Sequence, residues 1–180
     1  MKSSIIAHFT AAMLFSLIVG LIYATVQQTY RTAANDPQTG IARDVAHHIR
    51  YARTYYYLSD TGIDAGRSLG TFMQLYNQDG KLICSGGTIN GKAPAIPKGV
   101  LNNAKQSAEN AVTWQPASNV RLAAVAAYTG SPDTTFVVVA RSLQEVESRE
   151  SRLVRMILAA WALGLFIIGV HWLVQNKINY

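Results

Sequence analysis

The 180-residue chain has a single cysteine, Cys84, so no disulfide can form within it. The cross-linked framework of a small secreted scaffold is therefore excluded. Cys84 lies in the short apolar run KLICSGG, a setting that is typical of a buried small hydrophobe. A reactive thiol or an intermolecular disulfide is the alternative interpretation.

The sequence also lacks the residue sets on which enzymes rely. Ser85 and Ser142 have no histidine and aspartate at a spacing that suggests a nucleophile with its base. His47 and His48 are adjacent, so on a helix they would point about 100° apart, and no ligand partner follows at a metal-binding spacing. No basic stripe interleaved with aromatics indicates nucleic-acid binding. We therefore predict no catalytic residues, no metal, no cofactor and no nucleic-acid partner.

What the chain does contain is a long apolar run near each end. Each run has about 20 residues, the length that an α-helix needs to cross roughly 30 Å of hydrocarbon. The first run exceeds the apolar region of a signal peptide and no clear Ala-x-Ala site follows it, so we interpret it as an uncleaved anchor. The runs predict a first transmembrane helix within 1–28, a domain over 29–152, and a second transmembrane helix within 153–180.

Small residues recur at intervals of four in both apolar runs. Such stripes let helices approach closely in lipid, so we predict that they pack against a second copy or a partner signalling protein. The ordinary composition of membrane spans is the alternative. His8 and His171 lie near the ends of the runs, where an interfacial position is expected rather than a proton relay. The predicted packing residues are Ala12, Ser16, Gly20, Ala24, Ala160 and Gly164.

The polar middle of the chain predicts an α+β domain. Asn35-Asp36-Pro37 is a helix start signal, because an Asp cap is followed by Pro at the first helical position. The pair Asp79-Gly80 marks the turn of a hairpin between two apolar segments. Short loops join the last three strands, which favours antiparallel pairing. We expect a helix over 37–58, a hairpin over 72–85, a Gly- and Pro-rich loop over 86–99, a short helix over 100–110, strands over 111–115, 120–128 and 134–140, and a charged exit helix over 141–155. This order predicts a five-stranded antiparallel sheet with helices on one face.

This layout between two spans resembles the PAS-like, Cache-type sensor domains of bacterial receptors and two-component sensor histidine kinases. The resemblance lies in ordered segments rather than in a chemical motif. The segments are ANDPQ at 34–38, YNQDG at 76–80, PKGVL at 97–101, VTWQP at 112–116, VRLA at 120–123, and RSL with EVE at 141–147. It implies a membrane-anchored sensory or regulatory module in the bacterial inner membrane, with an extracytoplasmic PAS-like domain. Six residues follow Val174, so we expect the sensory input without a kinase output, signalling through a partner chain.

Charge alone leaves the orientation undecided. Arg149, Arg152 and Arg155 crowd the domain side of the second run, which by the positive-inside rule favours a cytoplasmic domain. The rule weakens for loops longer than about 60 residues, and the resemblance implies the opposite side. A structural or protein-interaction membrane protein with no small-molecule ligand is the alternative function.

Four side chains are candidates for binding a small-molecule ligand. Trp114 could form a pocket wall or simply fill the core. Arg121 could bind an anionic group or face solvent. Arg141 could do the same or pair with Glu145 four residues on. Tyr76 completes the set. The alanines of 120–128 could leave room for a ligand or let a helix pack closely.

Overall fold

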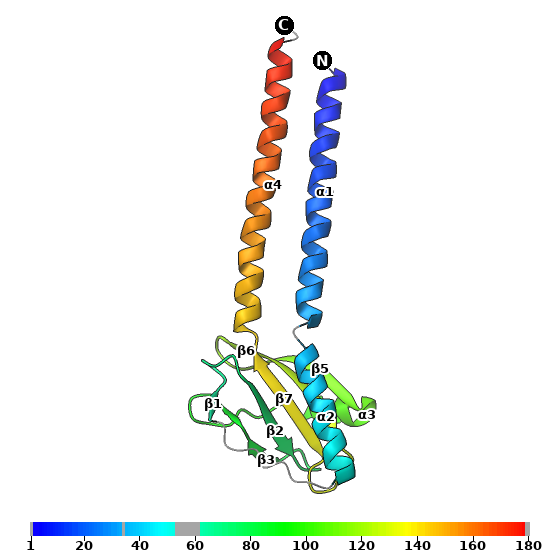
Figure 1. Cartoon of the computed structure of the whole chain (residues 1–180), viewed down its shortest axis with the longest axis vertical. Helices are drawn as coiled ribbons and strands as arrows, with labels where there is room; N and C mark the ends of the chain where they lie inside the picture. Colours follow the sequence, from blue (N-terminus) through cyan, green and yellow to red (C-terminus); the bar gives the residue numbers. More distant parts are fainter. Residues whose placement is uncertain (1, 34, 53–61, 179–180) are drawn as a thin grey trace. The chain divides into compact units, whose positions relative to one another are not determined.

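The computed structural model describes residues 2–33, 35–52 and 62–178 (Figure 1). It divides into two compact units. One unit comprises the two ends of the chain, Met1–Arg31 and Glu147–Tyr180, and the other is the intervening domain, Thr32–Val146.

Two long helices form the first unit. Helix α1 spans Lys2–Ala33 and helix α4 spans Gln144–Ile178. Within them, Ile5–Tyr30 and Gln144–Lys177 are long and apolar enough to cross a membrane. Their large apolar side chains are exposed, with Phe9 at 71% and Phe166 at 67%. Exposed apolar surface on this scale marks a surface that lipid or a partner covers.

The domain is built on a five-stranded antiparallel sheet, as predicted. Its strands are β2 (Thr71–Tyr76), β3 (Leu82–Ser85), β5 (Glu109–Ala117), β6 (Val120–Tyr128) and β7 (Phe136–Ser142). They lie in the order β3-β2-β7-β6-β5, so β2 and β7, the first and last of these five strands along the chain, are neighbours. The predicted hairpin turn is present between β2 and β3. Gly80 adopts a φ of 73°, and the Asn77 side chain accepts backbone N–H bonds from Asp79 and Lys81.

Helices cover both faces of this sheet, which corrects the expectation that they share one face. Helix α2 (Asp36–Ala52) lies on one face and helix α3 (Lys98–Ser107) on the other. The reason is visible in β7, where Val137 and Val139 pack toward α2 while Phe136 and Val138 pack toward α3. Because successive strand residues point to opposite faces, a strand that is apolar throughout needs cover on both.

We name the two cores by these helices. The α2-side core contains Ala42, Val45, Ala46, Ile49, Leu75, Val125, Ala127, Val137 and Val139. The α3-side core includes Phe72, Tyr76, Trp114, Leu122, Ala124, Ala126, Phe136 and Val138, with Leu101 and Ala104 of α3. Arg50 ties the end of α2 to the end of β6, because its guanidinium donates to the carbonyl oxygens of Thr129 and Tyr128 at 2.6 and 3.0 Å.

One predicted element is described only in part, and two local features differ from expectation. Helix α2 is described to Ala52, and the rest of the predicted helix, with Tyr55, Tyr56 and Tyr57, lies outside the described residues. Strand β5 continues past Pro116 to Ala117, with a register irregularity after Trp114; an edge strand tolerates the missing proline N–H. A two-stranded parallel pair, β1 (Ile63–Asp64) with β4 (Gly87–Thr88), was not predicted.

Candidate functional site

The four predicted ligand residues do not share one site. Pairing registers place Tyr76 and Trp114 on the α3 side of the sheet, together with Phe136 and Leu122, their respective cross-strand partners. Arg141 pairs with Ala123, so it lies on the opposite face, and Arg121 shares that face by alternation along β6. Two aromatic and two cationic candidates are therefore separated by the thickness of the sheet.

Tyr76 is the centre of a buried polar network on the α3 side. Its side chain is 1% exposed, and its hydroxyl donates to Oε1 of Gln74 at 2.9 Å. The same hydroxyl accepts the backbone N–H of Ile96 at 3.2 Å, while Nε2 of Gln74 donates to the carbonyl of Pro94 at 2.7 Å. Burial raises the pKa of Tyr76, and the Ile96 N–H partly offsets this. The network fixes the segment Pro94–Ile96 over the sheet.

Trp114 is a core residue rather than a free wall of a cavity. It is 7% exposed, packs in the α3-side core, and lies opposite Leu122 in the sheet. The alanines of β6 are also covered. Ala124 and Ala126 lie under α3, and Ala127 lies in the core under α2. The small alanine side chains of β6 thus lie under helices that pack closely on the two faces of the sheet.

The two arginines lie near the ends of their strands, Arg121 at the start of β6 and Arg141 near the end of β7. Arg141 donates from Nε to the carbonyl of Leu69 at 3.0 Å and pairs through Nη2 with Glu145 at 3.1 Å, the ion pair that its spacing predicts. Arg121 has an exposed side chain, and its backbone carbonyl accepts the N–H of Leu143 at 2.9 Å.

A second ion pair joins Arg43 of α2 to Glu109 of β5 through two bonds of 2.6 Å.

Among the described residues of the domain, a surface hollow beside the Tyr76 network is a candidate for a small-molecule site. It measures about 420 Å³ and is lined by Ile89, Asn90, Lys92, Ala93, Pro94, Pro116 and Ala117. Asn90 and Gly91 both have positive φ, and Ile89 and Lys92 exchange backbone bonds of 2.8 and 3.1 Å across them. This is a two-residue hairpin of the kind that Asn-Gly favours. The dipeptide is its signal in the sequence, so the expectation of an irregular loop over 86–99 was wrong at this point.

The hollow combines apolar walls with an amine. Pro94 and Pro116 supply rigid apolar surface, and Lys92 and Asn90 supply a cation and an amide. The carbonyl of Pro94 is held by Gln74, so one wall is anchored to the buried network. Such a site suits a compact ligand with an apolar body and an anionic group.

The thiol of Cys84 is favoured in its neutral form, and no histidine joins a metal-binding group among the described residues. Cys84 is half-buried, and its pKa is raised by burial and lowered to a smaller extent by a backbone bond at Leu75, so the neutral thiol is favoured. Within the described residues, no group of three His, Cys, Asp or Glu side chains could hold a metal ion.

The two apolar helices touch through only part of the predicted small-residue stripe. Ser16 accepts a hydrogen bond of 3.0 Å from the indole N–H of Trp161, and the ring of Phe15 fits against Gly164. Ala12 is half-buried, whereas Gly20, Ala24 and Ala160 are exposed. The stripe thus divides into three half-buried residues and three exposed ones.

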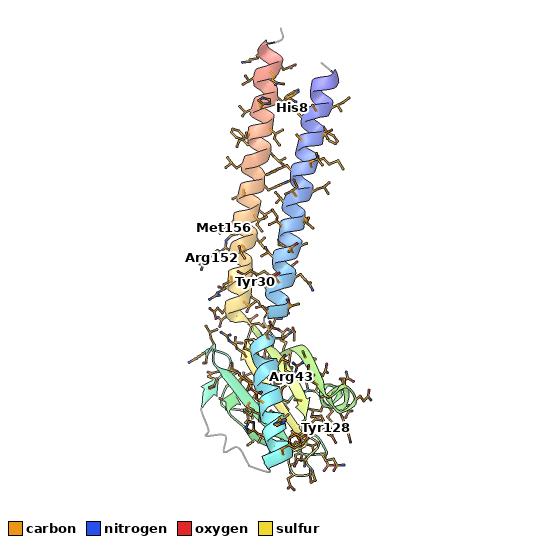
Figure 2. All side chains as sticks on the ribbon, turned by 45° about the vertical axis from the view of Figure 1, so that its right-hand side comes forward. His8, Tyr30, Arg43, Tyr128, Arg152 and Met156 are labelled. Atoms are coloured by element: carbon orange, nitrogen blue, oxygen red, sulfur yellow. The ribbon has the colours of Figure 1, made fainter. Side chains whose placement is uncertain are left out.

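Polar pairs lie at both ends of the helix pair. Nε2 of His8 lies 3.1 Å from Nδ1 of His171, and the His8 ring is turned toward α4 (Figure 2). At the other end, the Gln27 amide donates to Glu150 at 2.8 Å. The sequence places the two histidines near the span ends but does not pair them, because pairing depends on the offset between the helices.

Comparisons of the chain with protein-family models, with curated proteins and with solved structures gave no match.

Proposed function

We propose that the chain is a membrane-anchored sensory or regulatory module whose domain belongs to the PAS-like, Cache-type class and lies outside the bacterial cytoplasm. The observation that carries this proposal is the pair of exposed apolar helices at the two ends of one α+β domain. The five-stranded antiparallel sheet with a preceding long helix is the arrangement that the sequence resemblance implies.

The chain connection between domain and helix supports a signalling role. Strand β7 ends at Ser142 and helix α4 begins at Gln144, so one residue separates a central strand from a helix that is continuous to Ile178. In the proposed function, a change at the sheet would pass to the second span through this short connection. The output would pass to a second copy or a partner signalling protein through the spans.

The ligand would occupy the hollow lined by Lys92 and Pro94. Thermal unfolding of the full chain in detergent micelles, measured against a library of small anionic metabolites, tests this directly, because a ligand that binds the folded state raises the midpoint. Ala93→Trp fills the hollow and should abolish the shift. Ala95→Trp, an exposed position two residues away that does not line the hollow, should retain it.

A protein-interaction module without a small-molecule ligand is the second candidate. The division of Tyr76 and Trp114 from Arg121 and Arg141 favours it, because the predicted ligand residues form no common pocket. If no metabolite stabilises the wild-type chain, this candidate replaces the sensor. Both candidates require the two helices to be membrane spans.

A further inference from the structure

Helices α1 and α4 line an open apolar hollow of about 330 Å³ within their apolar segments. Its lining comes from both helices: Ser16, Val19, Gly20 and Tyr23 of α1, and Val154, Ile157, Leu158 and Trp161 of α4. Gly20 opens the hollow, since a Cβ built there meets no atom within 4 Å. The Ser16 hydroxyl and the Trp161 indole N–H are hydrogen-bonded to each other, so the walls that remain are mainly aliphatic and aromatic.

The unit formed by the two helices carries more basic than acidic residues. In the unit formed by the two helices, the basic residues are Lys2, Arg31, Arg149, Arg152, Arg155 and Lys177, and the acidic ones are Glu147 and Glu150. No acidic residue follows Glu150. Arg155 is exposed and lies three residues before Leu158, so it neighbours this lining residue on the surface of α4 without itself lining the hollow. Arg152 is also exposed and points away from α1 (Figure 2).

The distance along α4 between Arg155 and the apolar lining residues matches the separation of the phosphate and the acyl chain in a phospholipid. At a rise of about 1.5 Å per residue, Trp161 lies roughly 9 Å beyond Arg155, toward the middle of the apolar segment. A phosphate at the arginine level would therefore place its acyl chain alongside Leu158 and Trp161. Arginine binds phosphate oxygens through a planar fork of donors, and basic residues next to a span attract anionic lipid.

We propose that the hollow between α1 and α4 binds one acyl chain of an anionic phospholipid, whose phosphate is held by Arg155. This proposal rests on the proposed membrane location of the two helices and adds a ligand class to it. Bound lipid would set the spacing of the helices at the end nearer the domain. Lipid composition would thereby influence the path along which a signal passes.

Quenching of Trp161 by brominated lipid tests the proposal. The full chain, with Trp172→Phe to remove the second span tryptophan, is placed in phosphatidylcholine vesicles that contain a small, equal fraction of phosphatidylglycerol or phosphatidylcholine brominated on the acyl chains. We expect stronger quenching by the anionic lipid. Arg155→Gln should reduce this preference about fivefold, the effect of one arginine near a membrane surface. Gly20→Leu, which fills the hollow, should abolish it.

Matched controls lie elsewhere on the same helices. Gly169→Leu adds the same side chain at a glycine that is equally open but does not line the hollow. Lys177→Gln removes one positive charge from the far end of α4. Both should keep the preference for anionic lipid.

Equal quenching by the two lipids, or a preference that survives Gly20→Leu, would overturn the lipid site. Weak quenching by both lipids in chains that float with the vesicles would also overturn it and would indicate a second copy in the hollow. Chains that fail to float with the vesicles would instead contradict the proposed membrane location.

Discussion

The phenyl ring of Phe15 occupies the space that any side chain at Gly164 would need. A Cβ built at Gly164 overlaps the ring, whereas one built at Gly20 or Gly169 meets nothing within 4 Å. Of the two predicted packing glycines, Gly164 therefore mediates the contact between α1 and α4, and Gly20 opens the space beside it.

Gly164→Leu should separate the two helices, because the new side chain and the Phe15 ring cannot occupy the same volume. Overpacking of this kind costs about 1–3 kcal/mol. Disulfide crosslinking between cysteines at Ala12 and at Ile168, each half-buried, should fall in the variant. Gly169→Leu is the matched control, and an equal loss of crosslinking there would show that the Phe15 contact is not responsible.

Tyr76→Phe should destabilise the domain. The substitution keeps the ring but removes the hydroxyl that bonds Gln74 and the Ile96 N–H, leaving buried groups unsatisfied at a cost of about 1–3 kcal/mol. Urea unfolding followed by circular dichroism measures the change. Tyr128→Phe is the control, because Tyr128 is half-buried and packs its ring 5.7 Å from Phe136. A loss that is equal in both variants would contradict a special role for the Tyr76 hydroxyl.

Gly87→Ala should weaken the anchoring of β4. An added Cβ would strike the Phe72 ring, so we expect a loss of about 1–3 kcal/mol in urea unfolding. Gly99→Ala, at an open position in α3, should instead gain about 0.4–1 kcal/mol by restricting the unfolded chain. We therefore expect Gly87→Ala to lower the free energy of unfolding and Gly99→Ala to raise it. An unchanged free energy of unfolding in Gly87→Ala would show that Phe72 moves aside freely.

The Arg43–Glu109 pair should make stability depend on acid pH. Hydrogen bonding to Arg43 lowers the pKa of Glu109 below its ordinary 4.5. A group with a lowered folded pKa contributes stability above its ordinary pKa and loses that contribution as the pH falls through the folded value. The stabilities of wild type and Glu109→Gln should thus differ near neutral pH and converge in acid.

High salt distinguishes the loss of the Arg43–Glu109 charge interaction from a change in packing. The pair is partly exposed, so high ionic strength should shrink the difference between wild type and Glu109→Gln. Asp133→Asn, at an exposed position, provides the control for general charge removal. A Glu109→Gln difference that persists unchanged in acid and in high salt would assign the effect to shape rather than to charge.

Much of the domain was predictable because its signals are local. The hairpin follows from Asp79-Gly80 between apolar segments, and the apolar run at 134–140 correctly indicated a central strand. The same run requires cover on both faces, which is why the expectation of helices on one face was wrong. The β1–β4 pair carries no periodic signal, because each strand has two residues and its position depends on the distant contact of Gly87 with Phe72.

The candidate site was less predictable because it depends on register. Side chains alternate between faces, so shifting a strand by one residue moves every side chain to the other side. Tyr76 and Trp114 share a face, and Arg141 lies on the other, only through pairings between strands far apart in the chain. The hollow beside Pro94 and Pro116 likewise joins a hairpin tip to an edge strand, which no local pattern reveals.

Cysteine labelling of whole cells tests the central claim most directly. In a Cys84→Ala background, Lys92→Cys places a thiol on an exposed hairpin of the domain, and Lys177→Cys places one at the far end of α4. With the domain outside the cytoplasm, a membrane-impermeant maleimide added to intact cells should label Lys92→Cys, and Lys177→Cys should react only after lysis. The reverse pattern would place the domain in the cytoplasm and contradict an extracytoplasmic sensor.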